Sequence, residues 1–265
     1  MKKFFLMLSL FCLFVIGAIF DSKVNANEID DFLKAHTLLG EELESFERNE
    51  NESFSKNRMK ERDIDFEKLE EQYKSYVEAG IFSEEITLEL YIQLTTTPPP
   101  SDPVTPEFRS VAGNPKAGDI LITNGTSLGG LTGHAGIFLG DLGNGGILSI
   151  QGPGKNPEVI GIMTWMQRYS GADKWTKIYR PASKYKPETA AKWAINNYQG
   201  KKYSYKVNTK LFEKDPTYCS KIVYQSYWYS SAAVQLGGMY EPLIASPYDL
   251  PNYFDTKPTH IATWK

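Results

Sequence analysis

Cysteine and histidine are scarce in this chain, whose 265 residues include two cysteines and three histidines. A disulfide scaffold or a zinc finger needs more of these residues, so both are excluded. An excess of positive charge is also missing, because 29 basic and 32 acidic residues give a net charge of -3. That balance disfavours a nucleic-acid binder that neutralises phosphates. The 41% hydrophobic and 23% charged residues are instead typical of a folded globular protein.

The first 26 residues have the pattern of a secretory signal peptide. Two lysines after Met1 precede an apolar run from Phe4 to Phe20, and small residues lead up to Ala26. We therefore predict cleavage after Ala26 and a secreted or cell-envelope-associated protein with no stable membrane span. The alternative is an uncleaved anchor, although the run is shorter than the roughly 20 apolar residues of a spanning helix.

The rest of the chain divides into two unlike halves. Residues 27–94 show apolar side chains at helical spacing, as from Phe66 to Val77, and predict a helical region. Residues 95–110 contain Pro98-Pro99-Pro100 and predict a proline-rich linker, since consecutive prolines end a helix. Residues 111–265 then form the predicted catalytic domain, so the helical region is expected to be a separate module.

Strands and glycine turns dominate the first part of the catalytic domain, and helices dominate its end. Strands are predicted at 119–123, 134–140, 146–151 and 175–180, and helices at 163–169, 187–198 and 219–229. Strands followed by helices in one unit indicate an α+β fold, here a small antiparallel sheet packed on helices.

Cys219 is the first candidate for chemistry. After signal cleavage it is the only cysteine left, and an unpaired thiol in an exported protein is either buried or kept for its reactivity. It follows the helix-breaking segment Asp215–Tyr218 and opens a helix, where the partial positive charge of the helix N-terminus favours a thiolate. The alternative interpretation is a small buried hydrophobic residue.

His134 is the candidate base, because it opens a strand beside small residues that leave room for a pocket. His36 lies on an apolar helix face and is expected to be packing, whereas His260 is either a solvated tail residue or a strand residue. Gln151 ends the next strand, so its amide oxygen is predicted to accept the Nδ1 proton of His134 and orient the ring. Gln151 also has a plainer interpretation, as a polar residue at a strand end.

Three segments together resemble a known family. The stretches Lys116–Ile122 and Gly133–Gly140, followed 85 residues after His134 by Cys219, are similar to the core of the NlpC-type papain-like cysteine hydrolases. The late cysteine resembles the circularly permuted, YiiX-like branch, which is related to lecithin retinol acyltransferase. The resemblance implies a papain-like fold with Cys219 as nucleophile, His134 as base and a polar residue at position 151, where many relatives have an acid.

The resulting prediction is an exported cysteine hydrolase that cleaves amide bonds, with cell-wall-derived peptides as substrate and no metal or organic cofactor. Tyr218 is assigned a substrate-binding role because it adjoins Cys219. Two alternatives stay open. One is an acyltransferase or lipid esterase of the lecithin retinol acyltransferase type, and the other is a non-catalytic binding protein.

Overall fold

The computed structural model describes residues 65–101, 114–125, 133–171, 173–232 and 242–265. Residues 66–265 form one compact unit, which is described below by itself. The predicted signal peptide, the first part of the predicted helical region and residues 102–110 of the predicted linker lie outside the described residues.

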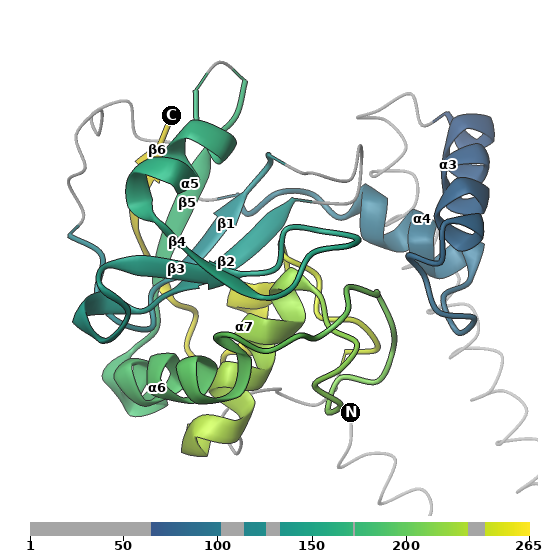
Figure 1. Cartoon of the computed structure of the whole chain (residues 1–265). Helices are drawn as coiled ribbons and strands as arrows, with labels where there is room; N and C mark the ends of the chain where they lie inside the picture. The colour runs from purple at the N-terminus through teal and green to yellow at the C-terminus, as the bar shows by residue number, and fades with distance from the viewer. Residues whose placement is uncertain (1–64, 102–113, 126–132, 172, 233–241) are drawn as a thin grey trace, which may run out of the picture. The chain divides into compact units, whose positions relative to one another are not determined.

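A six-stranded sheet of antiparallel neighbours is the centre of this unit (Figure 1). Its strands are β1 (Ile120–Thr123), β2 (His134–Phe138), β3 (Gly146–Ser149), β4 (Glu158–Gly161), β5 (Thr176–Arg180) and β6 (Thr259–Trp264), in the spatial order β4-β3-β2-β1-β5-β6. The strands predicted near β1, β2, β3 and β5 are confirmed. Strand β4 was not predicted, because its four residues include two glycine or charged positions and only two apolar ones.

The helices are α3 (Phe66–Glu78), α4 (Leu88–Thr96), α5 (Ile162–Tyr169), α6 (Pro187–Tyr198) and α7 (Cys219–Tyr227). Shorter helical turns are η1 (Gly140–Gly143), η2 (Ser183–Tyr185), η3 (Trp228–Ala232) and η5 (Leu250–Tyr253). The predicted helices at α5, α6 and α7 are confirmed. Within the described ranges, no helix has the length and apolar character needed to span a bilayer.

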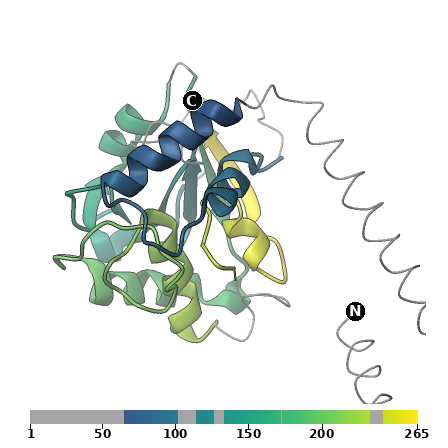
Figure 2. The same ribbon diagram turned by 90° about the vertical axis from the view of Figure 1, so that its right-hand side faces the viewer.

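The two faces of the sheet carry different helices, because side chains alternate along each strand. In β1, Ile120 and Ile122 pack in the core with α6 and α7, whereas Leu121 packs with Trp165 of α5. Both views show α6 and α7 below the sheet and α5 above it (Figures 1 and 2). This arrangement confirms the predicted α+β class with a small antiparallel sheet packed on helices.

The N-terminal helices belong to the same compact unit as the sheet, which differs from the predicted boundary at residues 95–110. Ile86 and Tyr91 are buried in the core that also contains α7. Val207 donates its N–H to the carbonyl of Ile81 at 2.9 Å and accepts the N–H of Ser83 at 3.0 Å. The apolar face of this region therefore finds its partner in the sheet-bearing unit rather than within a separate module. Thr95 and Thr96, assigned to the linker, lie in α4.

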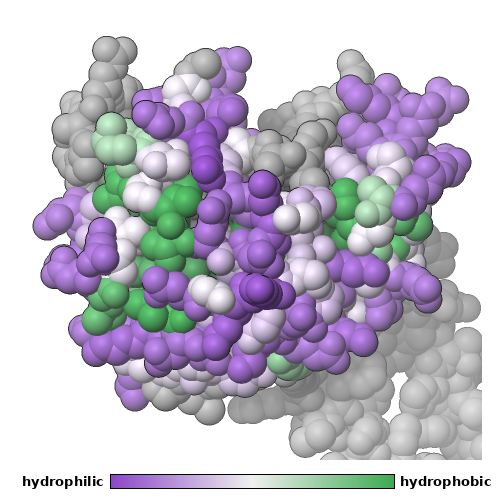
Figure 3. Space-filling model, in the orientation of Figure 1, coloured by the Kyte–Doolittle hydropathy of each residue, from purple (hydrophilic) through white to green (hydrophobic). Residues whose placement is uncertain are grey.

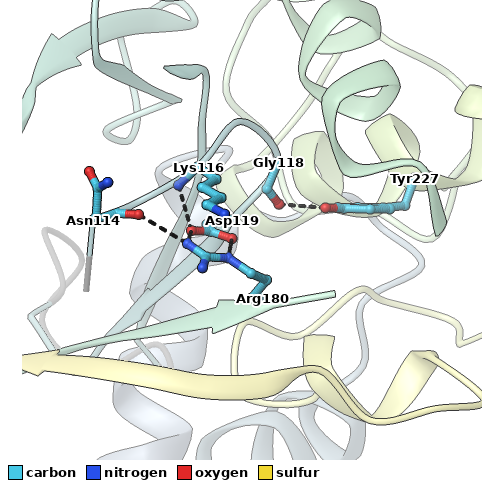
Figure 4. Close-up of polar contacts among 6 residues, drawn as sticks. All are labelled: Asn114, Lys116, Gly118, Asp119, Arg180 and Tyr227. Atoms are coloured by element: carbon cyan, nitrogen blue, oxygen red, sulfur yellow. Dashed lines mark hydrogen bonds and ion pairs between the residues drawn. The ribbon is translucent and has the colours of Figure 1, made fainter. Parts of the chain in front are cut away.

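A cluster of charged and polar residues holds the start of β1 by hydrogen bonds and an ion pair. Asp119 is only 1% exposed, and its carboxylate accepts hydrogen bonds from Arg180 Nε at 2.9 Å and from the Lys116 N–H at 2.7 Å. A second guanidinium nitrogen of Arg180 lies 2.6 Å from the same carboxylate. Nearby, the Tyr227 hydroxyl donates to the Gly118 carbonyl. We call this set the Asp119 cluster; Figure 4 draws it as Asn114, Lys116, Gly118, Asp119, Arg180 and Tyr227.

Candidate active site

Cys219 is the first residue of α7, as the sequence predicted. Tyr218 is the N-cap residue with extended backbone, and its side chain makes no capping hydrogen bond. The N–H groups of the first helical turn therefore keep free hydrogen-bonding capacity towards a ligand or the sulfur. This is a suitable place for an anionic sulfur or for a developing oxyanion.

The sulfur lies beside the start of β2, in the opening where β2 and β3 separate. The β2–β3 ladder ends at the pair Ile137 and Leu148. Leu139 points its N–H at β3, so Ile137 and Ala135, at alternate positions, point theirs the same way. Ala135 finds no β3 partner in this ladder, and its N–H interacts with Cys219 instead. The end of strand pairing thus creates the place that the sulfur occupies.

The thiol of Cys219 is neutral at rest. Its residue is only 7% exposed, and burial raises the pKa of the thiol, opposed in part by hydrogen bonds from the backbone of Ala135 and from Ser220. The sequence predicted a lowered pKa from the helix N-terminus. The structure reverses that direction, because the cost of burying a thiolate outweighs the N–H groups around it.

His134 is the first residue of β2, and its ring is buried against two aromatic side chains that also contact each other. The imidazole stacks on Trp165 with ring centroids 5.3 Å apart and packs against Tyr169 at 4.8 Å. Burial, together with the nearby positive charge of Arg168, lowers the pKa of His134 to about 3. The imidazole is therefore neutral near pH 7 and has a free lone pair for a proton.

The fold brings Cys219 and His134 to the same strand end from different sides. Cys219 packs in the core beneath the sheet and contacts the backbone of Ala135, the residue after His134. The imidazole packs with Trp165 on the α5 side. Transfer of a proton between the two side chains stays a prediction, and the shared strand end is the structural basis for it.

Gln151 reaches the imidazole through an intermediate residue. Its Nε2 donates to Ser149 Oγ at 3.2 Å, and Ser149 Oγ lies 3.4 Å from His134 Nε2. The Tyr169 hydroxyl donates to the Oε1 of Gln151. The described contact of the ring runs through Nε2 and Ser149, whereas the sequence predicted a direct bond from Nδ1 to Gln151. We call these four residues the His134 cluster: His134, Ser149, Gln151 and Tyr169.

Sequence reasoning missed Ser149, Tyr169 and Trp165. A signal for Ser149 existed, since it stands two residues before Gln151 and side chains two apart share a strand face. Tyr169 and Trp165 carry no such signal, because only the packing of α5 on the sheet brings them to His134.

Tyr218 is nearly fully buried, and its hydroxyl accepts the N–H of Ala245 at 3.1 Å. This bond ties the segment after residue 242 to the residue before Cys219, and a substrate contact for Tyr218 stays a prediction. His260 lies in β6, as one of its two interpretations expected, with Nε2 at 2.8 Å from Thr263 Oγ1. In the described part of the chain, no group of three or more histidine, cysteine or acidic residues could hold a metal ion.

Comparison with known proteins adds a family to this geometry. Residues 86–261 match the family described as "Lipoprotein N-acylation protein LnsA-like", a stretch that includes every residue of both polar clusters. A curated relative from Bacillus thuringiensis, named "Uncharacterized 30.3 kDa protein", is 33% identical over 173 residues. That match covers 62% of this chain and 63% of the relative. No solved structure matches.

The family match supports the acyl-transfer alternative better than the prediction of peptide hydrolysis. The papain-like resemblance is supported at this level, whereas the narrower permuted, YiiX-like assignment is not confirmed by the match.

Proposed function

Because the chain belongs to the LnsA-like lipoprotein N-acylation family, we propose that it is an envelope-associated acyltransferase that works through a thioester on Cys219. The acyl donor is an ester of a membrane lipid, and the acceptor is the free amino terminus of a lipoprotein. The observation that carries the proposal is the position of the sulfur, at a helix N-terminus and against the N–H of Ala135, beside His134.

In the first half-reaction, Cys219 attacks the ester carbonyl carbon of the donor. The thiol proton passes to the neutral imidazole of His134 as the carbon–sulfur bond forms. The N–H groups at the start of α7 stabilise the oxyanion. The carbon–oxygen bond then breaks, and His134 returns the proton to the leaving alkoxide. The products are a lysolipid alcohol and an acyl thioester on Cys219.

In the second half-reaction, the acceptor amine attacks the thioester carbonyl. Its proton moves to His134, the carbon–sulfur bond breaks, and the sulfur recovers a proton from the imidazolium. The products are an amide and the free thiol. No redox change or external co-reactant is needed, so the cycle balances.

Burial of the site supports transfer rather than hydrolysis. Cys219 is 7% exposed and His134 is 3% exposed in the free protein. A thioester formed there is shielded from bulk water, which lengthens its life until an amine arrives. A neutral thiol and a neutral imidazole also cost less to bury than an ion pair, and charge then develops only when substrate is bound.

Apolar surface outside the core supports contact with lipid. The sequence shows no continuous apolar helix in this half, but the fold exposes Met163 of α5 and Leu142 of η1. Figure 3 shows hydrophobic surface gathered on the side of the molecule where η1 and α5 lie. Exposed apolar side chains on a folded surface are a means of lipid contact that a linear pattern does not reveal.

The proposal is tested with the full chain in detergent and phospholipid vesicles whose acyl chains are labelled. We expect label on the protein that hydroxylamine removes and that Cys219→Ala abolishes. Addition of a lipopeptide with a free amino terminus should move the label into a hydroxylamine-resistant amide. Muropeptides are incubated in parallel. New peptide amine that depends on Cys219, without any labelled protein, would instead establish peptide hydrolysis and overturn the acyltransferase.

A further inference from the structure

The polar contacts of the His134 cluster connect Tyr169 to His134 through Gln151 and Ser149. Tyr169 contacts Gln151 through its hydroxyl, Gln151 contacts Ser149, and Ser149 contacts His134. The ring of His134 then packs against the ring of Tyr169. The comparisons assign no role to Ser149 or Tyr169.

We propose that Ser149 orients the imidazole of His134, and that Tyr169, acting through Gln151, sets the direction of the hydrogen bonds that reach it. Both are positioning residues for the reaction of Cys219. The inference rests on the proposed function, since it concerns the same thiol and imidazole.

Tyr169 is the first donor in this series of hydrogen bonds. The Tyr169 hydroxyl donates to the Gln151 amide oxygen, and because a phenol is a better donor than acceptor, this contact favours the orientation that turns the amide oxygen towards Tyr169. The nitrogen end must then face Ser149, and it donates to the Ser149 hydroxyl oxygen. A glutamine side chain without such a neighbour could take either amide orientation, and the Tyr169 hydroxyl favours this one.

The orientation of the Gln151 amide affects the imidazole of His134 because both side chains contact the hydroxyl oxygen of Ser149. A serine hydroxyl oxygen can accept two hydrogen bonds. Gln151 donates one of them, and in this proposal the Nε2–H of His134 donates the other, since Nε2 lies 3.4 Å from the Ser149 oxygen. With the ring proton on Nε2, the Nδ1 lone pair is free to take the thiol proton of Cys219. The partner of one ring nitrogen selects the tautomer, and only this tautomer serves as the base.

Tyr169 is itself held firmly enough to act as an anchor. Its carbonyl accepts hydrogen bonds from Thr123 Oγ1 at 3.1 Å and from Thr176 Oγ1 at 3.2 Å. These threonines lie at the end of β1 and the start of β5, and Trp165 Nε1 donates to Thr176 Oγ1 at 3.1 Å. The last turn of α5 is thereby fixed to the sheet.

The charge on Cys219 also affects the pKa of Tyr169. The pKa of Tyr169 is raised to about 12, mainly by burial and secondly by negative charge on Cys219. The phenol therefore stays protonated and continues to donate to Gln151 when the thiolate forms. The hydrogen bond from Tyr169 to Gln151 therefore keeps its direction while Cys219 loses its proton.

The test measures alkylation of Cys219 by iodoacetamide in the full chain, at pH 7 and at pH 10, so no acyl substrate is involved. At pH 7 the thiol is neutral, so alkylation needs His134 to take the proton as the new carbon–sulfur bond forms, whereas at pH 10 hydroxide in solution can remove that proton. Ser149→Ala should slow alkylation at pH 7 by about 10- to 100-fold, the equivalent of one hydrogen bond to a charged group. Tyr169→Phe should slow it by about 2- to 10-fold, the equivalent of a neutral hydrogen bond. Both variants should approach the wild-type rate at pH 10.

Matched controls separate positioning from packing. Ser149→Thr keeps the hydroxyl and should restore most of the rate at pH 7. Ser230→Ala and Tyr185→Phe remove a buried hydroxyl elsewhere, where each bonds only to backbone in the described contacts, and should match wild type at both pH values. A denaturation midpoint for each variant identifies those that fail to fold.

Each remaining outcome decides against the inference in a recognisable way. Equal losses at both pH values for Ser149→Ala would mean a structural role only. A wild-type profile for Ser149→Ala and Tyr169→Phe, with His134→Gln slow at pH 7, would overturn the inference and leave the proposed function standing. If His134→Gln itself alkylates at the wild-type rate, the thiol does not depend on the imidazole, and both ideas fail.

Discussion

The Asp119 cluster and the His134 cluster lie at opposite ends of the same strands. Both contain buried polar groups, but the first holds them as an ion pair and the second as neutral groups. Asp119 precedes β1 and meets Arg180 at the end of β5, whereas His134 pairs with Thr123 at the end of β1. The first cluster is an ion pair whose arginine side chain remains 30% exposed. The second is a chain of neutral groups in which His134 is 3% exposed.

This difference indicates that the Asp119 cluster contributes to stability and the His134 cluster to reactivity. Asp119 is paired with a guanidinium by two nitrogens, a bidentate arrangement that satisfies the hydrogen-bonding capacity of a buried carboxylate. His134 and Cys219 are held neutral by burial, with the pKa of each displaced away from the charged form. Groups held neutral near a strand end can exchange a proton during a reaction, and such displaced values are common at functional sites.

The largest expected effect comes from the His134 cluster. His134→Gln should reduce acyl transfer by about 10²- to 10⁴-fold, because a general base and acid is lost. Initial rates of label transfer from vesicles to lipopeptide measure it. His260→Gln makes the same replacement in β6 and should keep the wild-type rate. Equal losses in the two variants would remove His134 from the mechanism.

The Asp119 cluster should show the reverse behaviour. Arg180→Ala leaves the carboxylate of Asp119 buried without its guanidinium and should lower the free energy of unfolding by about 3 kcal/mol. The transfer rate of the folded fraction should change little. Urea denaturation measures the loss, with Lys192→Ala as control, since its ion pair with Glu188 is exposed and contributes about 0.5 kcal/mol or less. A large loss of rate at unchanged stability would contradict the division of roles.

An apolar site away from both clusters provides a reference for stability alone. Ile86→Ala removes a side chain that is 1% exposed between α3 and α4 and should cost about 2 to 4 kcal/mol in unfolding free energy. Val77→Ala, on an exposed position of α3, should change it by about 0.5 kcal/mol or less. If the two variants are equally stable, the N-terminal helices are not part of the sheet-bearing unit.

The smallest expected effect is a dependence of stability on acid. The unfolded chain protonates His134 near its ordinary pKa of 6.5, whereas the folded chain does so only near 3. The unfolded state therefore binds more protons in this window, and stability is lost as pH falls from 6.5 towards 3. At pH 5 the loss from this group is about 2 kcal/mol. Denaturation across pH should show that component in wild type, and a His134→Gln protein that keeps the same slope would contradict the burial of the imidazole.

Local patterns predicted most of the sheet and the site helices. The short apolar segments 119–123 and 134–140 between glycine turns, and the helix-breaking residues before Cys219, identified β1, β2 and α7 from neighbours in the chain. Gly80 follows the end of α3 with a positive φ of 67°, a conformation that favours glycine after the last turn of a helix. Strand β4 was not predicted because its two apolar residues are too few to form a recognisable strand pattern.

The domain boundary and the protonation states could not be read in the same way. Three prolines predict a break in the helix, but whether Ile86 and Tyr91 pack on a distant sheet depends on contacts between segments. Likewise, a helix N-terminus predicts a lowered thiol pKa, and the structure raises it because burial is a property of the whole fold.

By itself, then, the sequence determined the α+β class, the helix that begins at Cys219 and the strand that begins at His134, since these follow from local spacing and turn residues. Only the tertiary structure decided that Ser149 and Tyr169 join the imidazole and that the thiol is neutral. The physical reason is the end of β2–β3 pairing. That opening admits the sulfur next to Ala135, and packing of α5 on the sheet excludes water from the ring beside it.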